Sequence, residues 1–448
     1  MFRNIYWYTA VAVLLGNPLS VLAADEADLQ QQIQQLKQSN LQLEQRLQQV
    51  ETMAAQAQAA AQQASRPPAS NENNFNPAIS LILSGIYGQF RQDPAIPATG
   101  FAMNANNTGY TRGFSLKESE LAIAANIDPQ FRGVSTFSLD PAGGLSVENA
   151  FVQSSALGNG LNLKFGRFFS GLGYLNEQHA HAWDFVDQPL VYRALWDNQM
   201  GDDGLQLKWL AATDMFVEVG GEIGRGRGFP GSDRQNKNGS GAGVMFAHLG
   251  DDIGIEQSWR AGISLHETRR ENVISEAVPD LLGTAAGVSN RFSGNSKTAG
   301  LDFVWKYSPN GNFRERYLKV QSEYFRRKED GLLTYDTTGA NIPGNYAVTQ
   351  NGWYLQSVYQ FTPTWRTGLR YDRLAPGAAS VGASIAADVI SNYAFNPTRV
   401  SWMADYNPSE FSRIRLQLAH DNSRQGRTDN QLFLQYIMSL GAHGAHQY

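Results

Sequence analysis

The sequence contains no cysteine, which excludes disulfide bonds and thiolate metal sites. It also has no excess of positive charge: the formal net charge is −5 at pH 7, which argues against a general nucleic-acid-binding protein. Hydrophobic residues make up 42% of the chain, too little aliphatic bulk for a large α/β core. Glycine (43 residues) and aromatic residues (11%) are plentiful instead. This composition favours a sheet with one apolar face and one polar face.

Long apolar runs are absent beyond the N-terminus, so a membrane span of the mature chain must be a barrel strand. At the N-terminus, Arg3 precedes the apolar run Ile5–Leu15, Pro18 interrupts the chain, and small residues end at Ala24. A run of about 11 apolar residues is short of the roughly 20 that a spanning helix needs. The order of charged, apolar and small residues predicts a secretory signal peptide over residues 1–24.

Residues 25–65 follow a seven-residue repeat with alternating spacings of three and four. The core positions are Leu29, Ile33, Leu36, Asn40, Leu43, Leu47, Val50, Ala54, Ala57, Ala61 and Ala64. No glycine or proline interrupts this pattern, which predicts an α-helical coiled coil and therefore self-association through Leu29–Ala64. The repeat alone leaves dimer and trimer open. Residues 66–77 form a polar linker that begins with two prolines.

Beyond Pro77 the apolar residues recur at every second position. In 301–307, for example, Leu301 and Phe303 face one way, whereas Asp302 and Lys306 face the other. The candidate strands are residues 78–90, 113–127, 131–139, 145–156, 160–166, 203–211, 214–223, 241–249, 256–266, 297–307, 313–327, 350–361, 364–373, 399–406, 410–421 and 430–440. Alternation over about ten residues suits a tilted membrane strand. We therefore predict an all-β fold over residues 78–448: a 16-stranded antiparallel transmembrane β-barrel preceded by the N-terminal coiled coil.

Short and long connections alternate between these strands. Short turns are predicted at 128–130, 157–159, 212–213, 250–255, 308–312, 362–363 and 407–409, and the other, mostly longer loops at 91–112, 140–144, 167–202, 224–240, 267–296, 328–349, 374–398 and 422–429. This is the layout of an outer-membrane barrel with periplasmic turns and outer loops. It places both chain ends and the coiled coil in the periplasm. A soluble all-β protein would share the alternation, but the signal peptide, the regular loop lengths and the aromatic residues near strand ends favour the barrel.

Two features resemble known families. The coiled coil ahead of a barrel is similar to the plan of the sucrose porins. The segment Gly166–Phe169, followed by Trp183–Arg193, resembles the third-loop region of the phosphate-selective porin O/P family. The resemblance implies a homotrimer, because porins are commonly trimers, and a loop that folds into the lumen. It makes these charged residues candidates for a constriction: Arg167, Asp184, Asp187, Arg193 and Asp197. The family's dense run of pore arginines and lysines is missing, so phosphate selectivity does not carry over.

Charged residues opposite the apolar faces are expected to line the pore. They are Lys164, Lys208, Arg260, Lys306, Lys319, Arg366, Arg370, Arg413 and Arg415, with Glu218, Glu222, Asp302, Glu323, Asp372 and Asp405. On the lipid face such charges would cost about 2–4 kcal/mol each at the membrane midplane. The excess of basic groups predicts at most a mild anion preference. The alternative is that most of these residues are solvated wall residues without a role in selectivity.

Two pairs of histidines are spaced closely enough to bind zinc or copper. His179 and His181 lie in the predicted constriction loop, and His443 and His446 lie near the C-terminus. Neither pair has an evident third ligand in the sequence.

The sequence thus predicts an outer-membrane porin for passive diffusion of small hydrophilic solutes, in contact with outer-membrane lipid and without catalytic residues or a cofactor. The alternative is an outer-membrane uptake protein for a specific ligand such as a metal ion or chelate, although such receptors carry a globular plug and about 22 strands. A barrel enzyme would need a Ser–His pair on the lipid face; His266 and His420 lie near strand ends. A tethering role of the coiled coil could coexist with pore formation.

Overall fold

A computed structural model describes residues 77–92, 98–101, 110–139, 143–154, 157–232, 236–275, 289–337, 339–385 and 394–441. The predicted signal peptide, the coiled coil and the linker up to residue 76 lie outside the described residues, as do His443 and His446. These predictions therefore stay predictions.

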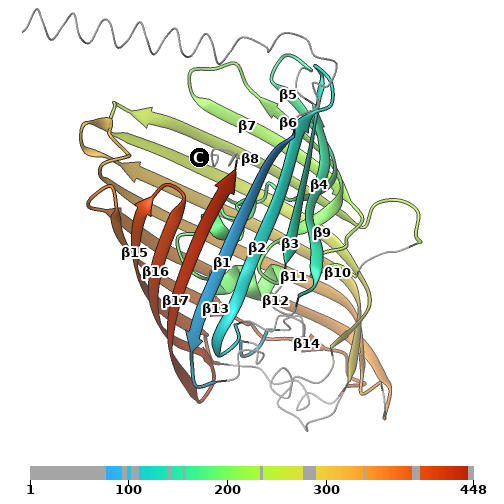
Figure 1. The fold of residues 1–448 in the computed structure, drawn as a ribbon. Helices are drawn as coiled ribbons and strands as arrows, with labels where there is room; N and C mark the ends of the chain where they lie inside the picture. The colour runs from blue at the N-terminus through green and yellow to red at the C-terminus, as the bar shows by residue number, and fades with distance from the viewer. Residues whose placement is uncertain are drawn as a thin grey trace, which may run out of the picture. The chain divides into compact units, whose positions relative to one another are not determined.

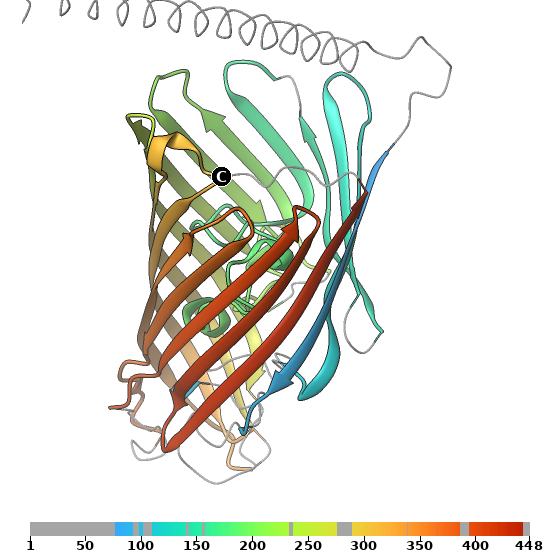
Figure 2. The same ribbon diagram turned by 60° about the vertical axis from the view of Figure 1, so that its left-hand side comes forward.

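The described residues form one antiparallel sheet that closes on itself (Figures 1 and 2). Its strands are β1 (Ala78–Gln89), β2 (Gly113–Asn126), β3 (Phe131–Leu139), β4 (Leu145–Ser154), β5 (Leu161–Phe169), β6 (Gly201–Leu210), β7 (Phe216–Gly224), β8 (Ala242–Ile253), β9 (Gln257–Ser275), β10 (Asn290–Tyr307), β11 (Tyr317–Tyr335), β12 (Ile342–Gln360), β13 (Trp365–Ala375), β14 (Ser380–Val381), β15 (Thr398–Ser409), β16 (Ser412–Arg424) and β17 (Arg427–Gly441). Three short helices accompany them: η1 (Ala180–Ala182), α2 (Leu190–Trp196) and η2 (Pro309–Gly311).

Closure follows from the pairing of β1 with both β2 and β17. The two-residue strand β14 pairs only with β12 among the described strands, so the barrel itself has 16 strands. A closed antiparallel sheet has no free edge, so every strand of the barrel can satisfy its backbone groups by pairing with two neighbours. The predicted all-β fold with a 16-stranded antiparallel barrel is confirmed, and the predicted coiled coil lies outside the described residues. None of the described helices is long and apolar enough to cross a bilayer.

The alternation of residues places apolar side chains outside the barrel and polar side chains inside it. Leu301 is 56% exposed on the outer face, whereas the next residue, Asp302, is 4% exposed. Leu416 and Leu418 are likewise exposed on the outer face, whereas Arg415, the residue before Leu416, points to the inner face and is fully buried. A large exposed apolar surface is costly in water and favourable in lipid. The polar inner face is the one that positions the candidate site.

The strands β9, β10, β11 and β12 are longer than predicted, with 19, 18, 19 and 19 residues. The predicted loops 267–296 and 328–349 were therefore too long, because parts of both ranges belong to these strands. The alternation fails there because outward residues are charged: Glu267 and Lys297 form an exposed ion pair of 3.0 Å. Without an apolar face, a strand has no period-two hydrophobic signal.

Candidate functional site: a loop held inside the barrel

The connection between β5 and β6, residues 170–200, lies inside the barrel (Figure 2), and we call it the inner loop. Its backbone N–H groups donate hydrogen bonds to side chains on several strands: Gly171 to Glu222 of β7 (2.8 Å), Leu175 to Glu323 of β11 (2.9 Å), Val186 to Gln417 of β16 (2.7 Å) and Leu190 to Asp372 of β13 (2.9 Å). Buried backbone groups without a strand ladder need such partners. Carboxylates and amides of the inner wall therefore hold the loop across the lumen.

The helix α2 provides the apolar part of this attachment. All its residues except Arg193 are buried. The Trp196 ring packs edge-on against Phe325 of β11, with a centroid distance of 4.5 Å. Val191 lies against Gly352 of β12 so closely that a Cβ on this glycine would meet its side chain at 2.8 Å. A glycine at this strand position is thus required for the close approach of the helix.

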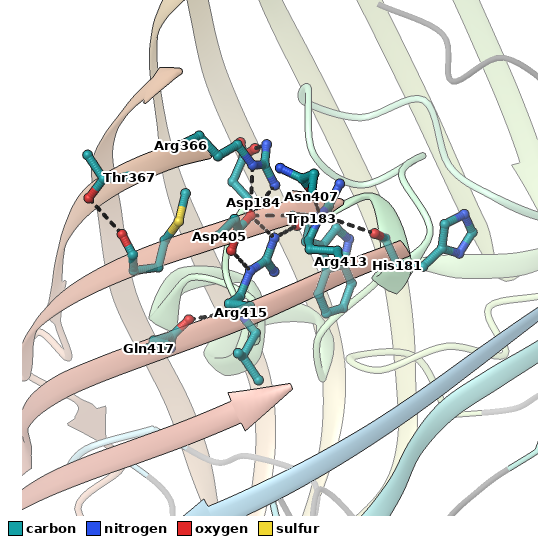
Figure 3. Close-up of polar contacts among 12 residues, drawn as sticks. His181, Trp183, Asp184, Arg366, Thr367, Asp405, Asn407, Arg413, Arg415 and Gln417 are labelled. Atoms are coloured by element: carbon teal, nitrogen blue, oxygen red, sulfur yellow. Dashed lines mark hydrogen bonds and ion pairs between the residues drawn. The ribbon is translucent and has the colours of Figure 1, made fainter. Parts of the chain in front are cut away.

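Asp184 fastens the inner loop to the strands β11, β12 and β13. Its carboxylate accepts hydrogen bonds from Arg366 (2.9 Å) and Gln356 (3.0 Å) and forms an ion pair with Lys319. Arg366 also binds Asp405 of β15 at 2.7 Å, and Arg415 of β16 binds the same carboxylate at 2.8 Å. Figure 3 shows Arg366, Asp405 and Arg415 converging from neighbouring strands toward Asp184 of the inner loop.

Asp187, three residues after Asp184 in the loop, forms a second set of ion pairs and hydrogen bonds with the wall. Arg370 of β13 donates to its side chain at 2.8 Å and to its backbone oxygen at 2.7 Å. Arg399 of β15 and Gln417 of β16 bind the two carboxylate oxygens. All four side chains are buried. A buried carboxylate is tolerated only with such charged and hydrogen-bonding partners.

The carboxyl groups of Asp184 and Asp187 are both ionised at neutral pH. Burial alone raises the pKa of Asp184 and Asp187, which lie on the loop outside the strands. The nearby cations outweigh burial: Lys319 and then Arg366 for Asp184, and Arg399 and then Arg370 for Asp187. The pKa of each carboxyl is therefore held well below its ordinary value. The inner loop thus presents carboxylates to a basic wall whose charge they neutralise.

Other predicted pore residues also lie on the inner face. Lys164 and Lys208 approach Glu177 of the inner loop at 3.9 and 3.1 Å, and Lys208 also lies 3.8 Å from Glu218. The Arg260 guanidinium lies over the Tyr174 ring, 5.4 Å from its centroid. Others lie on the same face: Lys306 is half-buried, Arg413 is 3.7 Å from Asp405, and Glu323 accepts the Tyr192 hydroxyl.

Two of the predicted constriction residues have other roles. Arg167 lies on the strand β5 rather than on the loop, and its guanidinium forms an ion pair of 2.6 Å with Asp203 of β6. Asp197 ends α2 with a left-handed backbone (φ 54°), a conformation that Asp and Asn adopt more readily than most residues. Arg193 is on the loop and half-buried, and its charge is among those that lower the pKa of Asp187.

Arg399 and Glu177 carry part of this network and were not among the predicted pore residues. Arg399 shares its face of β15 with Asp405, six positions along the chain, so the period-two pattern contained its signal. Glu177 lies in a loop, where no periodicity indicates which way a side chain points. Arg327 and Glu329 are both buried on β11; Arg327 is the last residue of the predicted strand 313–327, and Glu329 fell in the stretch 328–349 predicted as a loop.

The histidines of the inner loop meet carboxylates on the opposite part of the wall. His179 Nδ1 lies 3.1 Å from Glu120 of β2 and 3.0 Å from Glu148 of β4, and His181 Nδ1 lies 2.9 Å from Glu120. Burial lowers the pKa of His179, but hydrogen bonds to the two carboxylates outweigh it and raise the pKa to about 10. The inner loop is therefore tied on this side too, and the histidine pair acquires partners that the sequence alone did not reveal.

Comparisons with known proteins were consistent with this fold. No family model matches the chain. A protein of Aquifex aeolicus described as uncharacterized is 30% identical over 414 residues, which cover 84% of this chain and 81% of that protein. The structure of in-vitro folded OmpT, an outer membrane protein of Vibrio cholerae, covers 84% of this chain and all of its own at 11% identity, with a TM-score of 0.50. An anion-selective porin from Comamonas acidovorans covers 82% of this chain at 11% identity, with a TM-score of 0.46. At 11% identity, the likeness to OmpT shows the fold alone.

Proposed function

We propose that this chain, which belongs to the same family as the Aquifex aeolicus protein, is an outer-membrane porin, because it forms a closed barrel with apolar side chains outside and charged side chains inside. It would allow passive diffusion of small hydrophilic solutes through a lumen narrowed by the inner loop. The proposal includes residence in a bacterial outer membrane, contact with its lipid, and assembly as a homotrimer. It requires no catalytic group and no cofactor.

The observation that carries this proposal is the opposite character of the two barrel faces. The outer face carries exposed apolar side chains such as Ile263 (58%) and Leu369 (57%), whereas the inner face carries arginines, lysines and carboxylates. Charged side chains are favourable where water is present and costly against hydrocarbon. A barrel with lipid outside and water inside satisfies both faces at once.

The inner wall supports at most weak charge selectivity. Most of its arginines and lysines are neutralised by ion pairs, as at Asp184, Asp187 and Asp405. Arg193 and Arg260 are the exceptions on which we base a mild anion preference: among the described residues neither has a carboxylate within ion-pair distance, although Arg193 acts on Asp187 and Arg260 on Asp302 through their charge. Unpaired cations in a narrow lumen attract anions, and salt screens this effect.

Planar bilayers test the porin proposal directly. The purified protein should insert with stepwise increases in conductance that scale with the salt concentration. An uptake protein that stays closed without its ligand would insert silently. Insertion without conductance, demonstrated by extraction of the protein from the same membranes, would refute the porin proposal.

The double variant Arg193→Gln, Arg260→Gln is expected to lose the anion preference. In a salt gradient, its reversal potential should shift toward the cation-selective direction, because two unpaired lumen charges are removed. The control is Arg326→Gln, which removes an exposed cation from the outer face of β11 and should leave the reversal potential unchanged. An unchanged potential in the double variant would mean that other groups set the selectivity.

A further inference from the structure

A group of carboxylates and imidazoles on the inner side of β2 and β4 has no part in the proposed diffusion. It consists of Glu120, Glu148, His179 and His181. The ligand atoms of Glu120, Glu148 and His179 all lie within 4.8 Å of one another. His181 is not part of this closest set, and its Nδ1 lies 2.9 Å from the other oxygen of Glu120, Oε1. The two imidazole rings stack at a centroid distance of 5.8 Å.

Two β-bulges bring these carboxylates to the same place. The pairing of β3 with β4 shifts register between Thr136 and Phe137, which leaves Glu148 as an extra residue. Glu148 and its neighbour Asn149 consequently both contact the His179 ring, although successive strand residues normally point to opposite faces. Bulges commonly redirect side chains in this way next to functional sites.

The second bulge is on β2. The pairing of β1 with β2 shifts register between Ile82 and Ser84. Here Ser119 and Glu120 are neighbours in sequence, yet both are buried, at 4% and 2% exposure. Each bulged strand therefore aims one carboxylate at His179 and His181, which lie at the start and in the middle of η1. A regular barrel wall would direct only alternate residues inward.

We propose that Glu120, Glu148 and His179 bind one divalent transition-metal cation of the zinc type, with His181 as a hydrogen-bonding partner of Glu120. One imidazole nitrogen and two carboxylate oxygens are donors that zinc accepts, and three protein ligands leave the fourth tetrahedral position to water. Bonds of about 2.0–2.2 Å place neighbouring ligand atoms about 3.3 Å apart. The His179 Nδ1 atom lies 3.1 Å from Glu120 and 3.0 Å from Glu148, and the three ligand atoms all lie within 4.8 Å of one another. Two carboxylates balance the charge of the cation, and the His179 proton leaves to solvent as it binds.

The surroundings of the site allow a cation to enter and hold the ligands in place. The His179 side chain is 24% exposed and that of Glu148 10%, so one side is open, whereas Glu120 is 2% exposed. The Asn149 amide lies 2.9 Å from His179 Nε2. Turned by 180°, this amide accepts a hydrogen bond from Nε2–H, which leaves Nδ1 free for the metal. Outer-shell partners of this kind orient metal-binding histidines.

The experiment is a titration of the untagged full-length protein in detergent with Zn²⁺, followed by calorimetry and by thermal unfolding. One site per chain is expected, with a melting temperature that rises as zinc is added. The variant His179→Gln, His181→Gln should lose the site and the zinc-dependent rise. Glu148→Gln, which preserves side-chain size, should bind more weakly, and Asn149→Ala should weaken binding about 10- to 100-fold.

Two controls separate this site from other histidines. His420→Gln removes an exposed imidazole on β16 and should leave binding unchanged. His443→Gln with His446→Gln removes the pair near the C-terminus and should also retain the site. Zinc binding that survives His179→Gln, His181→Gln, or that disappears only with the C-terminal pair, would overturn the proposal. The titration needs no conductance, so its result is independent of the porin proposal.

Discussion

Replacing both Asp184 and Asp187 by asparagine is expected to release the inner loop from the β11–β16 wall. The exchange leaves Lys319 and Arg366 without the first carboxylate, and Arg370 and Arg399 without the second. Removing one partner of a buried ion pair typically costs about 3–5 kcal/mol. A loop that is no longer attached should leave a wider and more fluctuating lumen.

Single-channel recording checks this expectation: the double variant should show a higher and noisier conductance than the natural protein. Trypsin should also cleave the folded variant at Arg193, which is half-buried in the natural protein. The control is Asp251→Asn with Asp252→Asn, two exposed residues near the end of β8, which should change neither result. An unchanged conductance together with resistance to trypsin would show that the apolar contacts of α2 hold the loop by themselves.

Acid should act on the same attachment only at very low pH. The folded-state pKa of Asp184 and Asp187 is lowered by the neighbouring cations. Their contribution to stability is therefore fully present above the unfolded pKa of about 3.9 and is lost as the pH falls through the lower folded value. Conductance measured from pH 7 to pH 4 should consequently show no release of the loop. A step of increased conductance near pH 6 would contradict this assignment.

Leu301→Arg is expected to cost about 2–4 kcal/mol of stability in a lipid bilayer, the range for a basic residue on the lipid face at midplane. Leu301 is 56% exposed on the outer face of β10, between Ile263 of β9 and Tyr324 of β11. In a soluble protein, an exposed leucine would tolerate arginine within about 0.5 kcal/mol. If Leu301 faces lipid, the loss of stability in Leu301→Arg is therefore several-fold larger than if Leu301 faces water.

Folding into lipid vesicles at increasing urea concentration gives the unfolding free energy of each form. The control Leu301→Ala shortens the same side chain without adding charge and should be affected far less than Leu301→Arg. Equal stability of Leu301→Arg and the natural protein would mean that this face does not meet hydrocarbon, and the membrane assignment would fail with it.

Much of the barrel could be predicted because its signal is local. Leu301 and Asp302 point to opposite faces wherever the strand lies, since the geometry of a strand alone alternates its side chains. The same parity placed Arg366, Arg370 and Arg415 on the inner face. The same parity could not be applied to the parts of β9 to β12 next to the long loops. There, charged residues such as Glu267 and Lys297 occupy the outward positions.

The candidate site was predictable only in part. Asp184 and Asp187 came from a resemblance and lie on the inner loop, whereas Arg167 proved to be a strand residue paired with Asp203. Glu120 and Glu148 could not be connected with His179 from the sequence. They lie on strands whose alternation is interrupted by bulges, and a bulge shows no distinct residue pattern in a single sequence.

The sequence by itself determined the number of strands, the alternation of long and short connections, and which side of each strand is apolar. These properties depend on residues close together in the chain and on the fixed repeat of an extended backbone. Only the tertiary structure decided which connection turns inward, which charges neutralise one another, and where the imidazoles meet carboxylates. Such contacts join residues as far apart as Asp184 and Arg366, 182 positions along the chain. They depend on closure of the barrel, which no local pattern encodes.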